Sequence, residues 1–158
     1  MARKKFGDDP MDFLSKPTQS FMETTFDLPQ RRNDEKPGRT LKVLFDKRAP
    51  LAPKFKCRFV YCVTLDTKGN KTGCHYHKRK HEMLFCTNGS VKVIRCGKCY
   101  RHSTNLNASE HQAVYIEPGV IHQVIACTDG ATVVVIASAP NSCNDEFETE
   151  FPNSDKIS

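Results

Sequence analysis

The sequence predicts an all-β protein, a sandwich or a barrel, on three observations. Short runs of β-branched and aromatic residues recur from about residue 40 onward, turn residues separate almost all of them, and no run has the period of a long helix. Short strands at such regular spacing are typical of β-sandwiches and β-barrels. The 158 residues suffice for one domain.

Seven strands are predicted in this region, at residues 40–45, 57–65, 82–87, 90–96, 113–117, 123–127 and 131–137. Turn residues stand between most of them, at 66–70, 118–119 and 129–130. Asn88 and Gly89 give the strongest local signal, because this pair suits the two positive φ angles of a tight hairpin turn. We therefore expect a β-hairpin over residues 82–96.

The first 39 residues differ in composition from the rest. Prolines recur among charged and small polar residues, which disfavours helices and strands, although Phe13, Phe21 and Phe26 argue against complete disorder. We expect residues 1–39 to form an extended, Pro-rich, basic arm that lies on its own barrel or on a neighbouring subunit. A flexible arm is the alternative. Residues 40–158 would then form the β-barrel domain.

The charge distribution argues against a nucleic-acid partner. The formal net charge is +6, but residues 1–56 hold 13 basic and 8 acidic side chains, and the remainder is nearly neutral. No apolar run approaches the roughly 20 residues of a membrane span. Asp8, Asp9 and Asp12 lie where a secretory signal needs apolar residues. We therefore expect a cytoplasmic protein whose eight cysteines are reduced thiols.

Four residues form the chemically informative pattern. His75 and His77 would point from one face of an extended strand, and Glu82 follows where the chain turns into the next strand. His122 comes after a Pro-Gly turn, at the start of a later strand. Three imidazoles and a carboxylate are therefore expected to converge inside the barrel. The intervening basic run 78–80 is expected to be solvated, although Lys80 is one of several alternative partners for Glu82.

The spacing H-x-H-x4-E-x6-G, at His75, His77, Glu82 and Gly89, and the P-G-x-x-H ending at His122 resemble the two motifs of the cupin superfamily. That resemblance implies a cupin jelly-roll β-barrel. Segments 66–69, 73–78, 84–93, 115–118 and 135–138 resemble more narrowly the sugar-nucleotide 3,4-ketoisomerases, the branch that includes the WxcM-like domains. The chain departs from that branch at Thr72, where the branch has Arg, and at Glu82, where it has Gln.

The resemblance implies a ketoisomerase that acts on a dTDP-4-keto-6-deoxyhexose and needs no cofactor. His75 and His77 would transfer a proton from C3 to C4 through an enediol, a task that suits imidazole because its pKa of about 6.5 allows it to take and return protons near neutrality. The residues expected to bind the substrate are Arg58, Tyr61, Lys78, Arg95, Tyr115 and His122, with Arg101 as a further cation available for the diphosphate.

Two other functions remain open. The residues His75, His77, Glu82 and His122 would suit one divalent ion of Fe, Mn, Ni or Zn, which would make the protein a metal-dependent oxygenase, lyase or isomerase. Glu82 favours this alternative, whereas the other motifs favour the sugar branch. A non-catalytic sugar-binding cupin is the second alternative. A C-x-x-C pair at Cys96 and Cys99 suits a hairpin turn better than a zinc site.

We also expect a homodimer. Cupins that this chain resembles pair through edge strands, and an edge at residues 40–45 would need to be covered.

Overall fold

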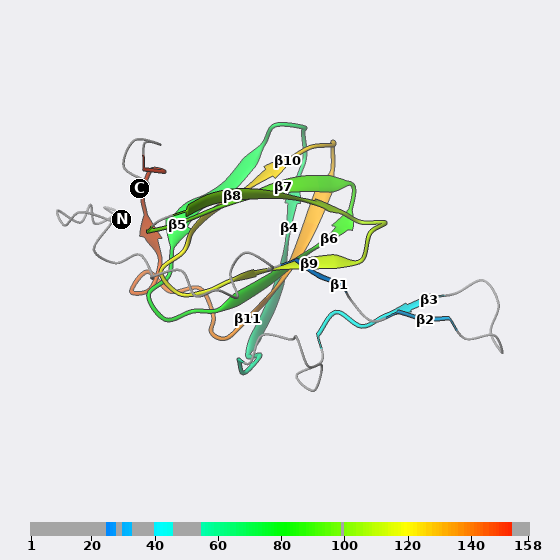
Figure 1. Cartoon of the computed structure of the whole chain (residues 1–158), viewed down its shortest axis with the longest axis horizontal. Coiled ribbons are helices and arrows are strands. Elements are labelled where there is room, and N and C mark those ends of the chain that lie inside the picture. Colours follow the sequence, from blue (N-terminus) through cyan, green and yellow to red (C-terminus); the bar gives the residue numbers. More distant parts are fainter. Residues whose placement is uncertain (1–24, 28–29, 33–39, 46–54, 99, 153–158) are drawn as a thin grey trace.

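Two antiparallel five-stranded sheets face each other in the computed structural model, which describes residues 25–27, 30–32, 40–45, 55–98 and 100–152 (Figure 1). The first sheet has the order β1 (Thr25–Asp27), β9 (Gln112–Ile116), β6 (Glu82–Asn88), β11 (Ala131–Ala137) and β4 (Phe59–Leu65). The second has the order β12 (Phe147–Glu148), β5 (Lys71–Tyr76), β10 (Ile121–Ala126), β7 (Ser90–Gly97) and β8 (Tyr100–Asn107). The predicted all-β class is confirmed.

The predicted strands agree with most of the observed ones, and 131–137 has the observed bounds of β11. Residues 40–42 form β3 (Thr40–Lys42), which pairs with β2 (Gln30–Arg32) in a separate ribbon instead of joining either sheet. Within the segment expected to be an arm, β1 pairs with β9 of the barrel. Residues 1–24 lie outside the described part of the chain. The prediction missed β8, because Leu106 is its only fully buried side chain and the rest of the strand is largely polar.

The hairpin predicted over residues 82–96 is wrong. β6 belongs to the first sheet and β7 to the second, so Gly89 lies at a corner where the chain changes sheets. The glycine has a φ of +67°, and a β-carbon there would overlap the hydroxyl of Thr128, which accepts a hydrogen bond from the amide of Ser90 at 3.0 Å. The predicted positive φ is confirmed at Gly89 but is wrong at Asn88, and a corner between sheets can require it at the glycine as much as a hairpin does.

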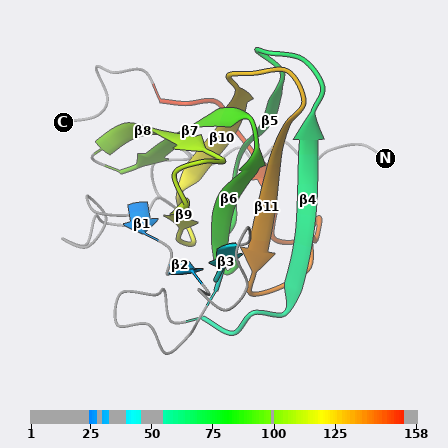
Figure 2. The same ribbon diagram turned by 90° about the vertical axis from the view of Figure 1, so that its right-hand side faces the viewer.

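Apolar side chains fill the space between the sheets and also cover parts of their outer faces. Figure 2 shows β6, β11 and β4 side by side in the first sheet. Its inner face contributes Leu84, Val114 and Val133 to the interior core, together with side chains of the opposite sheet. Its outer face carries a second cluster, which Phe45 and Phe55 cover. β9 is therefore buried on both faces.

No helix in the described ranges is long and apolar enough to cross a membrane. The seven cysteines of those ranges are all free thiols. Cys96 is buried at the end of β7, whereas Cys99 lies outside the described residues.

Candidate active site

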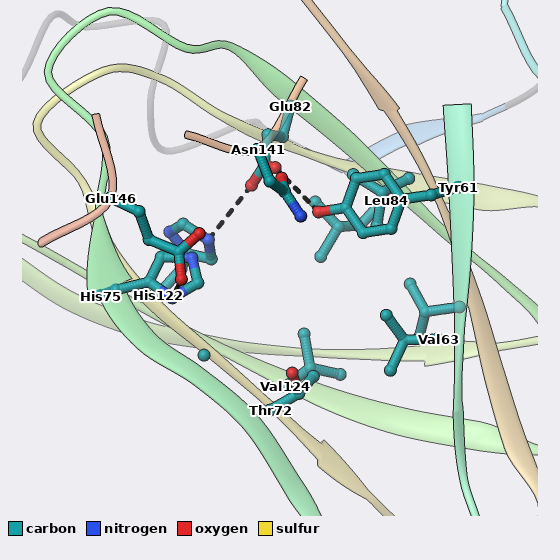
Figure 3. Close-up of a pocket in the computed structure, with 13 residues that line it drawn as sticks. Tyr61, Val63, Thr72, His75, Glu82, Leu84, His122, Val124, Asn141 and Glu146 are labelled. Atoms are coloured by element: carbon teal, nitrogen blue, oxygen red, sulfur yellow. Dashed lines mark hydrogen bonds and ion pairs between the residues drawn. The ribbon is translucent and has the colours of Figure 1, made fainter. Parts of the chain in front are cut away.

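A cavity of about 160 Å³ opens between the two sheets, and both sheets contribute to its wall (Figure 3). Leu84 and four valines form its apolar part, whereas Tyr61, His75, Glu82 and His122 supply polar groups. An engineered cavity of about 150 Å³ accommodates benzene. The volume therefore fits one six-membered ring, and any larger ligand would extend beyond the pocket.

A β-bulge in β5 brings two of the imidazoles together. His75 pairs with His122 of β10, but the next pair is Gly73 with Gln123, so Cys74 is the extra residue, with a φ of +78°. The bulge shifts the strand's alternation by one residue, and both His75 and Thr72 consequently line the cavity. A β-carbon at Gly73 would lie 2.9 Å from the backbone oxygen of His122, which explains the glycine.

The three imidazoles surround the Glu82 carboxylate. The ring centroid of His75 lies 4.6 Å from that of His122 and 4.9 Å from that of His77. The Oε2 atom of Glu82 lies 3.2 Å from Nε2 of His122 and 3.7 Å from Nε2 of His77. Tyr61 donates a hydrogen bond of 3.0 Å to the other carboxylate oxygen, Oε1. The structure therefore brings together all four residues of the motif pattern.

Backbone carbonyls fix the protonation of two imidazoles. Nδ1 of His77 lies 2.7 Å from the carbonyl oxygen of Asp145, and Nδ1 of His122 lies 3.0 Å from that of Val120. A carbonyl only accepts hydrogen bonds, so we assign the proton to Nδ1 in both rings, which leaves Nε2 facing Glu82. At 3.2 Å, Nε2 of His122 and a carboxylate oxygen need a proton or a cation between them. The cluster therefore has a place for one transferable proton.

Burial and neighbouring charges together determine the protonation of His75, Glu82 and Tyr61. Burial, with the neighbouring His122 and His77, lowers the pKa of His75 to about 3, so this imidazole is neutral near pH 7. Burial alone would raise the pKa of Glu82, but His122, His77 and Lys80 outweigh it and hold that pKa below its ordinary value. Burial and the adjacent Glu82 raise the pKa of Tyr61, which keeps its hydroxyl protonated.

The cluster includes Lys80, one of the alternative partners that the sequence left open for Glu82. Lys80, predicted to be solvated with the rest of the 78–80 run, is buried, and its Nζ lies 2.6 Å from Oε1 of Glu82. Nζ also donates a hydrogen bond of 2.5 Å to Oδ1 of Asn141 and lies 5.3 Å from the centre of the Tyr61 ring. The expectation of a solvated side chain was wrong at this one position, because Arg79 and Lys78 are exposed.

The segment that follows β11 closes one side of the pocket. Asn141 and Glu146 line the cavity, and Oε1 of Glu146 lies 3.7 Å from Nδ1 of His75. The carboxylate of Asp145 accepts three hydrogen bonds of 3.1 Å from the backbone amides of residues 78–80. Sequence reasoning missed these residues, because no local pattern links them to a loop about 65 residues earlier.

Several residues predicted to bind substrate lie elsewhere. Tyr115 is on the outer face of the first sheet, where its hydroxyl lies 2.6 Å from Nδ1 of His81. Arg95 is buried inside the barrel and donates a hydrogen bond to Thr104, but it does not line the cavity. Arg58 and Lys78 are exposed outside the cavity. His77 contacts Glu82 without lining the cavity, whereas Tyr61, His75 and His122 line it.

Comparison with known proteins identifies the family of the chain. A family model described as "FdtA: WxcM-like, C-terminal" matches residues 24–151. The chain belongs to this family. The family resemblance inferred from the motifs is confirmed, and no curated protein matches the sequence of this FdtA family member.

Three solved structures are similar to this chain over more than three quarters of its length. The 3,4-ketoisomerase QdtA from Thermoanaerobacterium thermosaccharolyticum in complex with TDP is 25% identical, with 84% of this chain and 90% of that chain covered and a TM-score of 0.66. A mutant of QdtA in complex with TDP-4-keto-6-deoxyglucose is 24% identical, with 79% and 86% covered and a TM-score of 0.67. The RmlC epimerase from Mycobacterium tuberculosis shares the fold at 16% identity, with 77% and 66% covered and a TM-score of 0.66. The predicted cupin jelly roll is confirmed.

Proposed function

We propose that the protein is a sugar-nucleotide 3,4-ketoisomerase that acts on a TDP-linked 4-keto-6-deoxyhexose. The observation that carries the proposal is the placement of His75 opposite His122 at a cavity that fits one sugar ring. Membership of the FdtA family supports it, as do relatives that are 3,4-ketoisomerases crystallised with TDP or TDP-4-keto-6-deoxyglucose. The nucleotide would lie outside the cavity, because the volume accommodates the ring alone.

The proposed reaction transfers one proton from C3 to C4 and one from the C3 oxygen to the C4 oxygen. The C4 carbonyl acidifies the hydrogen on C3, and neutral His75 takes that proton while the electrons of the C–H bond form an enediolate. Protonation of C4 and of the C4 oxygen, with loss of the hydroxyl proton at C3, then leaves the carbonyl at C3 and a hydroxyl at C4. The proton held between His122 and Glu82 is available for delivery, and Tyr61 and Lys80 keep the carboxylate in position. No redox partner is needed.

The test is incubation with TDP-4-keto-6-deoxyglucose, followed by proton NMR. We expect the keto group to move from C4 to C3 and the rate to fall about 10²- to 10⁴-fold in His75→Asn, the usual contribution of an acid–base group. Exposed His102→Asn is the matched control and should retain the wild-type rate. An unchanged NMR spectrum of a sugar that calorimetry shows to bind would favour the non-catalytic alternative.

A specific observation also favours a metal-dependent cupin as a second candidate. The donor atoms of His75, His77, Glu82 and His122 all lie within 4.8 Å of one another. Nε2 of His77 is buried and has no hydrogen-bond partner in the described part of the chain. This donor set fits Fe, Mn, Ni or Zn, which would act as a Lewis acid or activate oxygen. Near-stoichiometric metal in protein purified without added metal, lost in His75→Ala and Glu82→Gln, would support this candidate over the first.

The predicted homodimer remains part of the proposal. Edge strand β4 supports it, because Val60 is 55% exposed there and is the one large apolar side chain of the described residues that is so open. Light scattering at micromolar concentration should return twice the mass of the chain, and a monomer mass would contradict the prediction.

A further inference from the structure

Lys80 is an unusual component of the candidate site. Lysine is almost never fully buried unless it is paired, and the side chain of Lys80 is only 1% exposed. Its ammonium group contacts the Glu82 carboxylate at 2.6 Å and Asn141 at 2.5 Å, and it faces the ring of Tyr61. The positive charge is therefore held in place by neighbours from three separate parts of the chain.

The backbone prevents this ammonium group from moving away easily. The amide of Lys80 donates a 3.1 Å hydrogen bond to Oδ2 of Asp145, whose other oxygen binds the amides of residues 78 and 79. Asp145 is itself buried. Swinging Lys80 into solvent would leave the Glu82 carboxylate, only 3% exposed, without its closest cation, which is a costly change for a buried charge.

We propose that Lys80 is a built-in counter-ion for Glu82 that weakens divalent-metal binding at the cluster of His75, His77, Glu82 and His122. A metal ion held by this cluster would share the one carboxylate with an ammonium group only 2.6 Å from it. Like charges at such short range repel strongly where water is excluded. The donor set suits a metal, whereas the adjacent charge opposes it.

The inference concerns the same residues as the proposed isomerase but does not rest on its substrate. If the proposal is correct, the Lys80 side chain makes metal binding unfavourable, and the four metal-ligating residues do not. Replacing that side chain should turn the pocket into an ordinary metal site. A failed sugar assay would leave this prediction intact, because metal affinity is measured without any sugar.

The test is titration of the purified, chelator-treated protein with Co²⁺, in which calorimetry and visible absorption measure the binding. We expect Lys80→Met to bind Co²⁺ about 10- to 100-fold more tightly than wild type, the range over which groups beside metal ligands usually act. Lys92→Met removes an exposed lysine from β7 and should match wild type. His122→Ala in each background identifies binding to cysteine thiols elsewhere, which would persist in that variant.

Lys80→Gln serves as a second variant, because its amide can still hydrogen-bond to Glu82 and Asn141 if Met destabilises the fold. Circular dichroism and a thermal melt establish that each variant is folded. Tighter binding in either folded variant, abolished by His122→Ala, supports the proposal. Equal affinity in wild type, Lys80→Met and Lys80→Gln would overturn it, and so would tight wild-type binding that the substitutions do not improve.

Discussion

Protonation of His75 is the property on which the proposed chemistry depends most directly. The pKa of His75 falls to about 3 because of burial and the neighbouring His122 and His77. The imidazole is therefore unprotonated at neutral pH and able to accept a proton, although a pKa this low makes it a weaker base than an ordinary imidazole. In the unfolded chain the same group has an ordinary pKa of about 6.5. This difference between the pKa of His75 in the folded and unfolded chain makes the stability of the fold depend on pH.

Stability should consequently depend on pH through His75. The unfolded chain binds more protons at this residue below pH 6.5, so the free energy of unfolding should fall as the pH falls from 6.5 towards 3, by up to about 1.4 kcal/mol per pH unit. Urea unfolding of chelator-treated protein between pH 5 and 7 measures the slope. His75→Gln should give a shallower slope, and slopes equal to wild type would contradict the lowered pKa.

Among the structural elements, the bulged strand β5 matters most to the site. In a regular strand, Thr72 and His75 are three residues apart and would point to opposite faces of the second sheet, and the bulge at Cys74 brings them to the same face. The bulge therefore provides the inward position of His75 while the rest of the strand keeps its pairing with β10. Gly73 makes this possible through its φ of +83° and its close approach to the backbone of His122.

Gly73→Ala tests this function of the bulge. The new β-carbon would lie 2.9 Å from the His122 carbonyl, so β5 and β10 must separate locally. Gly69→Ala is the matched control, because Gly69 has a similar φ of +89° but no atom within 4 Å of its β-carbon position. Both variants should lose on the order of 1 kcal/mol to backbone strain. Gly73→Ala should lose more stability in urea and also lose isomerase activity, and equal losses would contradict the contact.

The segment after β11 is the second element whose contribution to stability can be tested. Asp145→Ala removes three hydrogen bonds to the backbone amides of residues 78–80 and should cost about 3 kcal/mol in the free energy of unfolding. Asp129→Ala removes a single exposed bond to the amide of Lys68 and should cost about 1 kcal/mol or less. Urea unfolding compares the two. Similar costs would show that the loop does not depend on Asp145.

At the scale of the whole molecule, the sequence predicted the class of the fold better than the path of the chain. Strand patterns depend on local residues, so most strands were found. The sheet to which each strand belongs depends on distant contacts, and the corner at Gly89 therefore looked like a hairpin. Tyr115 was placed in the pocket because β9 is buried on both faces, which removes the polar residues that normally identify the outer face.

In the candidate site, too, local patterns could be predicted from the sequence and distant contacts could not. The spacing of His75, His77, Glu82 and His122 predicted that they would converge, and the structure brings them together. The sequence left Lys80 as only one of several partners for Glu82, because its burial depends on Asp145 and Asn141, which lie more than 60 residues later in the chain. A run of three basic residues carries no local sign that its third member points inward.

The wall of the pocket comes from both sheets, with Tyr61 and Glu82 on one and His75 and His122 on the other. The geometry of the proposed catalytic site thus depends on the distance between the two sheets. A core substitution that lets the layers drift by a fraction of an ångström would separate base from carboxylate while leaving every strand intact. The rate of the proposed reaction would then respond to a change in the distance between the sheets more strongly than the melting temperature would.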